Sequence, residues 1–220
     1  MLCVPDRRPV SRRAVLMGCS TAVLIAAAAL TAPAAQAADR ADRLAAYVPV
    51  ITETRAPIGW IDFCTQTPRE CAGGPTQPRD VVLTPKAWRD LVQVNTWVNN
   101  AIKPMTDLDH WGVVEKWSYP DDGYGDCEDY VLLKRRMLLQ AGWPREALLI
   151  TVVRDKKDEG HAVLTVKTDK GDFVLDNQAE NIVLWSDTGY RFVKRQSQSD
   201  PNVWVSLGDP HAAPATATAR

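Results

Sequence analysis

The sequence lacks an excess of charge of either sign. Its 26 lysine and arginine residues nearly balance 27 aspartate and glutamate residues, giving a net charge of −1. Without a basic surface, binding to nucleic acid or to an anionic membrane is not expected. Histidine is scarce, with three residues, and no low-complexity block is long enough for a fibrous or disordered protein. The 220 residues therefore indicate a globular protein of one or at most two domains.

Residues 1–37 have the pattern of a signal peptide. Four arginines precede an alanine-rich apolar run, and Ala35-Gln36-Ala37 supplies a small-residue cleavage site. The segment 11–16 resembles a twin-arginine signal, with valine at the usual aromatic position. We predict an exported, periplasmic protein whose mature chain begins near Ala38 and carries a net charge of −4. An uncleaved membrane anchor is the alternative.

Removal of this segment leaves three cysteines, an odd number for an oxidising compartment. Cys64 and Cys71 lie in a turn-rich stretch and are near enough in sequence to close a small loop. We predict a disulfide between them. Cys127 then remains as a free thiol, which is unusual in an exported protein.

The mature chain changes from helical to β patterning near residue 148. Residues 38–85 are rich in Pro, Gly, Thr and Asp and predict a loop-rich layer. Apolar spacing predicts helices over 86–102 and 126–140, joined by a long irregular connection of the kind that is often functional. In the second helix, Lys134, Arg135 and Arg136 are expected to form the solvent-exposed face.

Short apolar segments separated by turn signals predict a set of strands after residue 148. They span residues 148–154, 162–168, 173–176, 182–185, 190–194 and 203–207. Strands this close in sequence must mostly pair antiparallel. Helices followed by an antiparallel sheet define an α+β fold, which we place over residues 38–208, with a disordered tail at 209–220.

Cys127 is predicted at the start of the second helix, where the helix dipole and free N–H groups favour a thiolate. We therefore expect a lowered pKa for this thiol and a nucleophilic role. The alternative is a buried cysteine that packs as a small hydrophobic residue. The acidic neighbours on both sides speak against that alternative, but their charge would raise the pKa unless a cation offset it.

A thiolate nucleophile needs a base and a group that orients the base. His161 opens one predicted strand, and Asp176 ends the next among apolar residues. If the intervening loop spans 168–171, Asp176 faces Val163 and becomes the diagonal neighbour of His161, within reach of its side chain. If the turn is only Lys170-Gly171, the two residues are too far apart.

Three segments in this order resemble the bacterial transglutaminase-like cysteine proteinases, a group that includes the LapG-type periplasmic proteases. They are Gly125-Asp-Cys-Glu-Asp-Tyr130, Gly160-His-Ala-Val-Leu164 and Phe173-Val-Leu-Asp-Asn177. The resemblance implies a papain/transglutaminase-like fold, in which N-terminal helices pack on an antiparallel sheet and the nucleophile lies at a helix N-terminus. It further implies Cys127 as nucleophile, His161 as general base and Asp176 as the group that orients the imidazole.

The resemblance also implies a calcium site at Asp126 and Glu128. Oxygen ligands suit this cation, whereas the alternative is that both acids only complement the helix dipole. The implied substrate is a protein, such as a large surface adhesin, and the implied partner is a membrane-bound regulator. Two other functions stay open: transglutaminase-type acyl transfer to amines, and a noncatalytic calcium- or peptide-binding module.

Overall fold

The computed structural model describes residues 45–208. The predicted signal peptide and the predicted tail at 209–220 lie outside the described residues. Between residues 45 and 208, no helix is both long enough and apolar enough to cross a bilayer.

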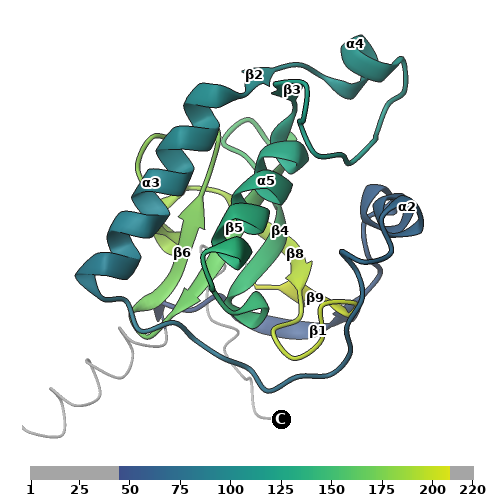
Figure 1. Ribbon diagram of the computed structural model, residues 1–220. Coiled ribbons are helices and arrows are strands. Elements are labelled where there is room, and N and C mark those ends of the chain that lie inside the picture. Colours follow the sequence, from purple (N-terminus) through teal and green to yellow (C-terminus); the bar gives the residue numbers. More distant parts are fainter. Residues whose placement is uncertain (1–44, 209–220) are drawn as a thin grey trace, which may run out of the picture. The chain divides into compact units, whose positions relative to one another are not determined.

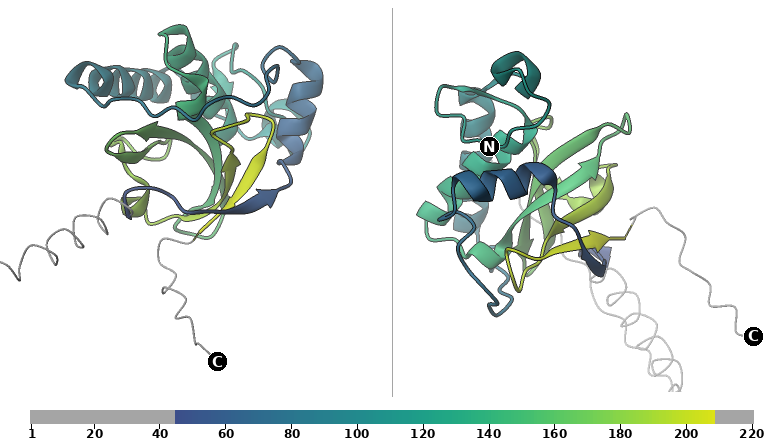
Figure 2. Two further views of the ribbon diagram at one scale, coloured as in Figure 1. Left: turned by 90° about the horizontal axis from the view of Figure 1, so that it is seen from below. Right: turned by 90° about the vertical axis from the view of Figure 1, so that its right-hand side faces the viewer.

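The described chain is built on a curved, fully antiparallel sheet with the order β1-β9-β8-β4-β5-β6-β7 (Figures 1 and 2). Its strands are β1 (Val50–Thr54), β4 (Leu148–Arg154), β5 (Gly160–Thr168), β6 (Gly171–Leu175), β7 (Val183–Leu184), β8 (Arg191–Gln196) and β9 (Trp204–Leu207). The predicted antiparallel strands are confirmed, and β1 is an additional edge strand.

Helices α3 (Pro85–Ala101) and α5 (Cys127–Gln140) lie against one side of the sheet, as predicted from their apolar spacing (Figure 1). Thr84 caps α3 by accepting a hydrogen bond of 3.1 Å from the backbone N–H of Ala87, and Pro85 occupies the first helical position. The shorter elements are α2 (Ile58–Gln66), β2 (Lys103–Pro104), α4 (Asp107–Trp111), β3 (Tyr124–Gly125), η1 (Arg145–Ala147) and η2 (Trp185–Asp187).

Both faces of the sheet are covered, which explains the long apolar stretches in its central strands. The larger core packs α2, α3 and α5 against one face and contains Leu91, Val98, Leu138 and Leu164. A smaller core on the other face contains Val163, Trp185 and Phe192. Residues in β5 alternate between the two cores, and the strand is buried from His161 to Thr168.

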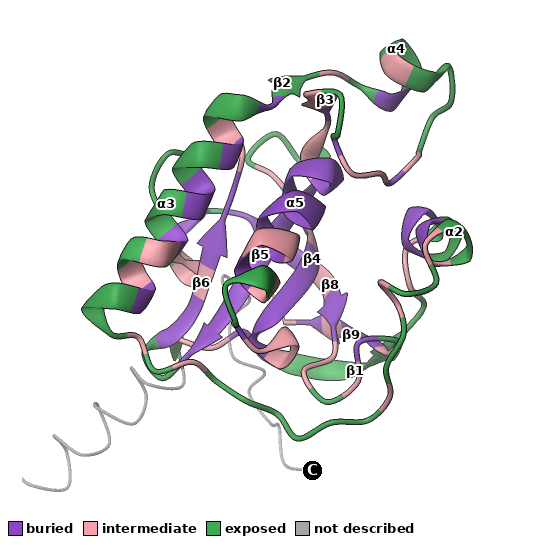
Figure 3. Cartoon of the chain, viewed as in Figure 1, coloured by how far each residue is buried: buried purple, intermediate pink, exposed green. Residues whose placement is uncertain are grey.

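One expectation about solvent exposure was wrong. The loop-rich segment predicted over residues 38–85 also contains β1 and α2 in its described part, residues 45–85. In α5, Lys134 and Arg135 are buried, whereas Arg136 is partly exposed. Figure 3 shows most of α5 in the colour of buried residues. The physical reason is that α5 is covered on nearly all sides, so it has no wide solvent-facing stripe.

Candidate active site

Cys127 is the first residue of α5 and is half-buried. Cys64 and Cys71 form a disulfide, so Cys127 is the free cysteine among residues 45–208. Its thiol donates a hydrogen bond of 3.1 Å to Glu128 Oε2, and a hydrogen bond from the backbone of Ala162 reaches the sulfur. The sulfur therefore lies beside the residue that follows His161.

The expectation of a lowered pKa for Cys127 is wrong for the protein without a bound cation. Burial, followed by the charges of Glu128 and Asp126, raises the pKa of the thiol well above its ordinary value. The hydrogen bond from Ala162 acts in the opposite direction but is the smaller effect. The position at a helix N-terminus is thus not enough to ionise this sulfur, because two carboxylates flank it.

His161 and Asp176 are joined by a hydrogen bond of 2.8 Å between Nε2 and Oδ1, and both side chains are buried. The strand register explains this contact, because Leu164 pairs with Leu175 and Thr168 with Gly171. Of the two turns considered, this register is the one that places Asp176 opposite Val163, with Asp169 and Lys170 between the paired residues Thr168 and Gly171.

The Asp176 carboxylate is held by further donors. Oδ1 also accepts a hydrogen bond from the backbone N–H of Gln178, and Oδ2 accepts one of 2.7 Å from the hydroxyl of Tyr190. Burial raises the pKa of Asp176, but the hydrogen bonds from His161, Tyr190 and Gln178 outweigh it and hold the pKa below its usual value. Asp176 is therefore an ionised acceptor at neutral pH.

Because Asp176 is ionised, His161 Nε2 carries the proton of their hydrogen bond and Nδ1 keeps its lone pair. The donor nearest to Nδ1 is the side-chain amide of Gln178, at 3.4 Å. Tyr190 also packs its ring edge-on to the imidazole, with centroids 5.8 Å apart. Tyr190 was not predicted as a site residue, since nothing in its local sequence indicates that it reaches Asp176.

Cys127 and His161 line one cavity of about 220 Å³ at the N-terminus of α5. Its other charged side chains are Glu115, Glu128 and Lys194. Trp117 also lines it, with the indole N–H donating a hydrogen bond of 2.8 Å to Glu115 Oε1. Glu115 and Trp117 belong to the predicted long connection before Cys127, which therefore contributes to the walls of the site.

A cluster of three carboxylates lies directly beside Cys127. Asp107, Asp126 and Glu128 offer oxygen atoms that all lie within 4.8 Å of one another. Burial and mutual repulsion raise the pKa of Asp126, and they raise that of Glu128 to about 9. Asp126 Oδ1 is buried without a hydrogen-bond partner. An unpartnered oxygen among crowded carboxylates fits a hard divalent cation.

Asp107 was not expected in this cluster. It comes from α4 and is buried, and its Oδ2 accepts a hydrogen bond from the backbone N–H of Lys116. The acids nearer to Cys127 in sequence have other partners: Asp121 pairs with Arg136, and Asp122 with His110. Asp129 accepts a hydrogen bond from the backbone N–H of Ser118.

A cysteine at the start of a helix, packed on an antiparallel sheet that carries a His–Asp pair, is the arrangement of papain- and transglutaminase-like enzymes. The sequence profile of the family described as bacterial transglutaminase-like cysteine proteinase BTLCP matches residues 50–212. The chain therefore belongs to this family and is a cysteine peptidase.

Solved structures of LapG from Legionella pneumophila are similar to this chain. The EGTA-treated form is 26% identical to this chain, with a TM-score of 0.46. The alignment covers 56% of this chain and 71% of the LapG chain. The calcium-bound form is 23% identical to this chain, with a TM-score of 0.47. The alignment covers 58% of this chain and 75% of the LapG chain. No curated protein matches the chain.

Proposed function

We propose that this chain is an exported cysteine endopeptidase that cleaves a protein substrate through a thioester, with Cys127, His161 and Asp176 as its triad. The observation that carries the proposal is the hydrogen bond of 2.8 Å between His161 Nε2 and Asp176 Oδ1. This bond orients the imidazole in the cavity that Cys127 lines and leaves Nδ1 as an acceptor.

The proposed reaction begins when Nδ1 of His161 accepts the thiol proton of Cys127. The sulfur attacks the scissile carbonyl carbon, and the resulting oxyanion is held by the backbone N–H of Cys127 and a donor from the 111–124 loop. Trp117 of this loop lines the cavity, and its indole N–H becomes the donor we assign when it exchanges its present acceptor, Glu115 Oε1, for the oxyanion. His161 then gives its proton to the leaving amine, and water, activated by the same imidazole, hydrolyses the thioester.

We further propose that Asp107, Asp126 and Glu128 hold calcium. When bound, the ion supplies positive charge that offsets the two carboxylates beside the sulfur. The support is the geometry of the cluster and the unpartnered Asp126 Oδ1. Asp126 and Glu128 flank Cys127, so the same backbone segment would present the sulfur to substrate and the carboxylates to the ion.

The proposed domain spans residues 38–208, preceded by a signal peptide at 1–37 and followed by a tail at 209–220. The disulfide supports export to an oxidising compartment, the periplasm, because such bonds are rare in the cytosol. The proposed substrate is a surface protein of the adhesin type, and a membrane-bound regulator is a proposed partner; both rest on the family resemblance.

The test compares wild-type protein with Cys127→Ala on purified exported and surface proteins from the same cell. We expect defined cleavage products with wild type and a loss of roughly 10⁴-fold or more with the variant. Trp143→Phe, a conservative change at a buried residue outside the cavity, is the matched control and should stay active. Equal cleavage by Cys127→Ala would refute the proposal.

Adding a primary amine separates the two fates of a thioester. Hydrolysis gives two fragments with free ends, whereas acyl transfer gives a product whose mass includes the amine. We expect hydrolysis to dominate. Absence of both products on every surface protein, together with no alkylation of Cys127 by iodoacetamide, would favour the noncatalytic binding module instead.

A further inference from the structure

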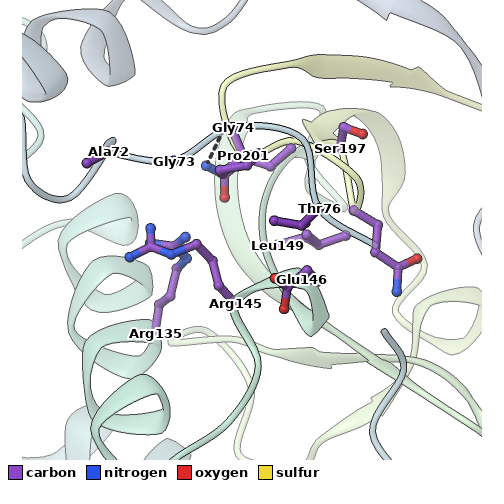
Figure 4. A pocket seen from close by; sticks show the side chains of 12 residues that line it. Ala72, Gly73, Gly74, Thr76, Arg135, Arg145, Glu146, Leu149, Ser197 and Pro201 are labelled. Atoms are coloured by element: carbon purple, nitrogen blue, oxygen red, sulfur yellow. Dashed lines mark hydrogen bonds between the residues drawn. The ribbon is translucent and has the colours of Figure 1, made fainter. Parts of the chain in front are cut away.

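A second cavity has a volume of about 240 Å³. Figure 4 shows the side chains that line it. It shares no lining residue with the cavity that contains Cys127. Arg135 of α5 and Arg145 of η1 line it together with residues from β4, β8 and the 72–76 segment. Neither arginine has a part in the proposed catalytic reaction.

Arg135 is 2% exposed, although it carries a charge. Its Nε donates a hydrogen bond of 3.1 Å to the backbone carbonyl of Leu148, but its Nη2 is buried without a partner. Burial, and next the charge of Arg145, lower the pKa of Arg135 to about 10, so the group stays charged at neutral pH. A buried guanidinium nitrogen without an acceptor is costly, and a bound acceptor would remove that cost.

Arg145 brings a second positive charge to the same place. Its Nη1 donates a hydrogen bond of 2.8 Å to the backbone carbonyl of Glu70, and Figure 4 shows its guanidinium group beside that of Arg135. Neither guanidinium forms an ion pair with any carboxylate between residues 45 and 208. Two like charges held together without a directly paired carboxylate attract an anion.

The two acids in this region form no ion pair with the arginines, although the charge of Glu70 acts on Arg135 and partly offsets the effect of Arg145 on its pKa. The side chain of Glu70 is hydrogen-bonded to Tyr119 instead. Glu146 is the one acid that lines the cavity, and it makes no ion pair with the arginines. The charge of the lining side chains is therefore positive.

The other walls combine small and polar residues with the apolar side chains of Leu149 and Pro201. Gly73 and Gly74 carry no side chains, so the 72–76 segment adds little bulk to the cavity wall that it forms. Thr76 and Ser197 line the same cavity, and both hydroxyls are hydrogen-bonded to Ser199. Planar guanidinium groups match the geometry of oxyanions and can bind them with two hydrogen bonds.

We propose that Arg135 and Arg145 form a binding site for a small oxyanion the size of phosphate or sulfate. The bound anion accepts hydrogen bonds from both guanidinium groups and links α5 and η1 to the segment that follows the Cys64–Cys71 disulfide. The ligand we assign is a free ion, since a cavity of about 240 Å³ accommodates an ion of this size. The site does not depend on the catalytic proposal.

The first test measures the thermal unfolding midpoint of the full chain in sodium sulfate or phosphate, against sodium chloride of equal ionic strength. We expect both oxyanions to raise Tm saturably, by about 3 °C at ten times Kd, and chloride to have no such effect. Arg145→Gln should lose at least tenfold in affinity. Arg89→Gln, an exposed arginine on α3 outside the cavity, is the matched control and should respond as wild type does.

The second test locates the ion directly. Crystals grown with selenate should give an anomalous peak between Arg135 and Arg145 that disappears in Arg145→Gln. Equal stabilisation of wild type and Arg145→Gln, or selenate found only elsewhere, overturns the proposal. If Arg145→Gln fails to fold, the selenate position in the wild-type protein decides the question.

Discussion

The hydroxyl of Tyr190 donates a hydrogen bond of 2.7 Å to Oδ2 of Asp176, the carboxylate oxygen that His161 does not use. Tyr190 immediately precedes β8, whereas Asp176 follows β6. The carboxylate is thus fixed from two sides, and its orientation relative to the imidazole is set before any substrate binds. Tyr190 is a positioning residue, since it acts through Asp176.

Tyr190→Phe tests this role. Loss of a hydrogen bond to a charged group costs about 1.5 kcal/mol, which corresponds to a decrease of about tenfold in kcat/KM if the bond orients the triad. The effect should fall on kcat rather than KM, and the acidic limb of the pH–rate profile should move. Tyr119→Phe removes a tyrosine–carboxylate hydrogen bond elsewhere and is the matched control. Unchanged kcat in Tyr190→Phe would show that the bond only supports the fold.

The buried Lys134 predicts a pH-dependent stability. Its Nζ has no hydrogen-bond partner, and burial lowers its pKa from 10.5 to about 7, an effect that Asp176 only partly offsets. The unfolded chain therefore binds more protons than the folded chain between about pH 7 and 10. Below this window the charged, buried Lys134 lowers the unfolding free energy by its full amount. This destabilisation declines as the pH rises from about 7 to 10.

Lys134→Met should accordingly stabilise the protein near pH 7, by about 1–4 kcal/mol, because an apolar side chain replaces an unpaired buried charge. The difference between variant and wild type should shrink as the pH approaches 10. Urea unfolding at several pH values measures both effects. Lys170→Met, at an exposed position, controls for the loss of a charge. A difference that stays constant across this window would mean that Lys134 is not neutralised on folding.

The parts of the site that follow local sequence rules could be predicted. The position of Cys127 at a helix start follows from the preceding glycine-containing loop, and the His161–Asp176 contact follows from strand register. Asp107 and Tyr190 could not be found this way, because each reaches the site from a segment whose path depends on the whole fold. No local pattern encodes which loop packs beside which strand.

Exposure was the property that the sequence predicted least well. Helical periodicity assigned Lys134 and Arg135 to solvent, because charged residues usually form the wet face of a helix. The structure covers α5 with the sheet, with α3 and with loops from distant parts of the chain. Likewise, α2 has little amphipathic contrast, so its nine residues did not stand out from the surrounding loop.

Removal of the Cys64–Cys71 disulfide is predicted to lower the stability of the protein and to leave its catalytic activity unchanged. The bond closes a loop of seven residues in sequence separation, for which chain entropy gives about 2.5 kcal/mol. The double variant Cys64→Ser/Cys71→Ser should lose about this much unfolding free energy and keep its activity at low temperature, since neither residue lines the catalytic cavity. Dithiothreitol should lower the Tm of the wild type but not that of the double variant. An equal decrease in both proteins would mean that dithiothreitol acts on something other than the Cys64–Cys71 bond.

Asp107→Asn tests the third proposed ligand of the carboxylate cluster. Unlike Asp126 and Glu128, Asp107 is not a sequence neighbour of Cys127. If Asp107, Asp126 and Glu128 share one ion, neutralising Asp107 should weaken calcium binding by about tenfold or more, because the ligand charge sets the affinity of such sites. Isothermal titration of the purified chain measures this directly, and the calcium concentration that gives half-maximal activity should rise in parallel. Asp109→Asn, which changes an exposed acid on the same short helix, is the control and should bind calcium as wild type does.

Calcium affinity that is equal in Asp107→Asn and wild type would remove Asp107 from the site. Full activity of the wild-type protein in excess chelator would show instead that the carboxylates beside Cys127 do not need a cation for catalysis.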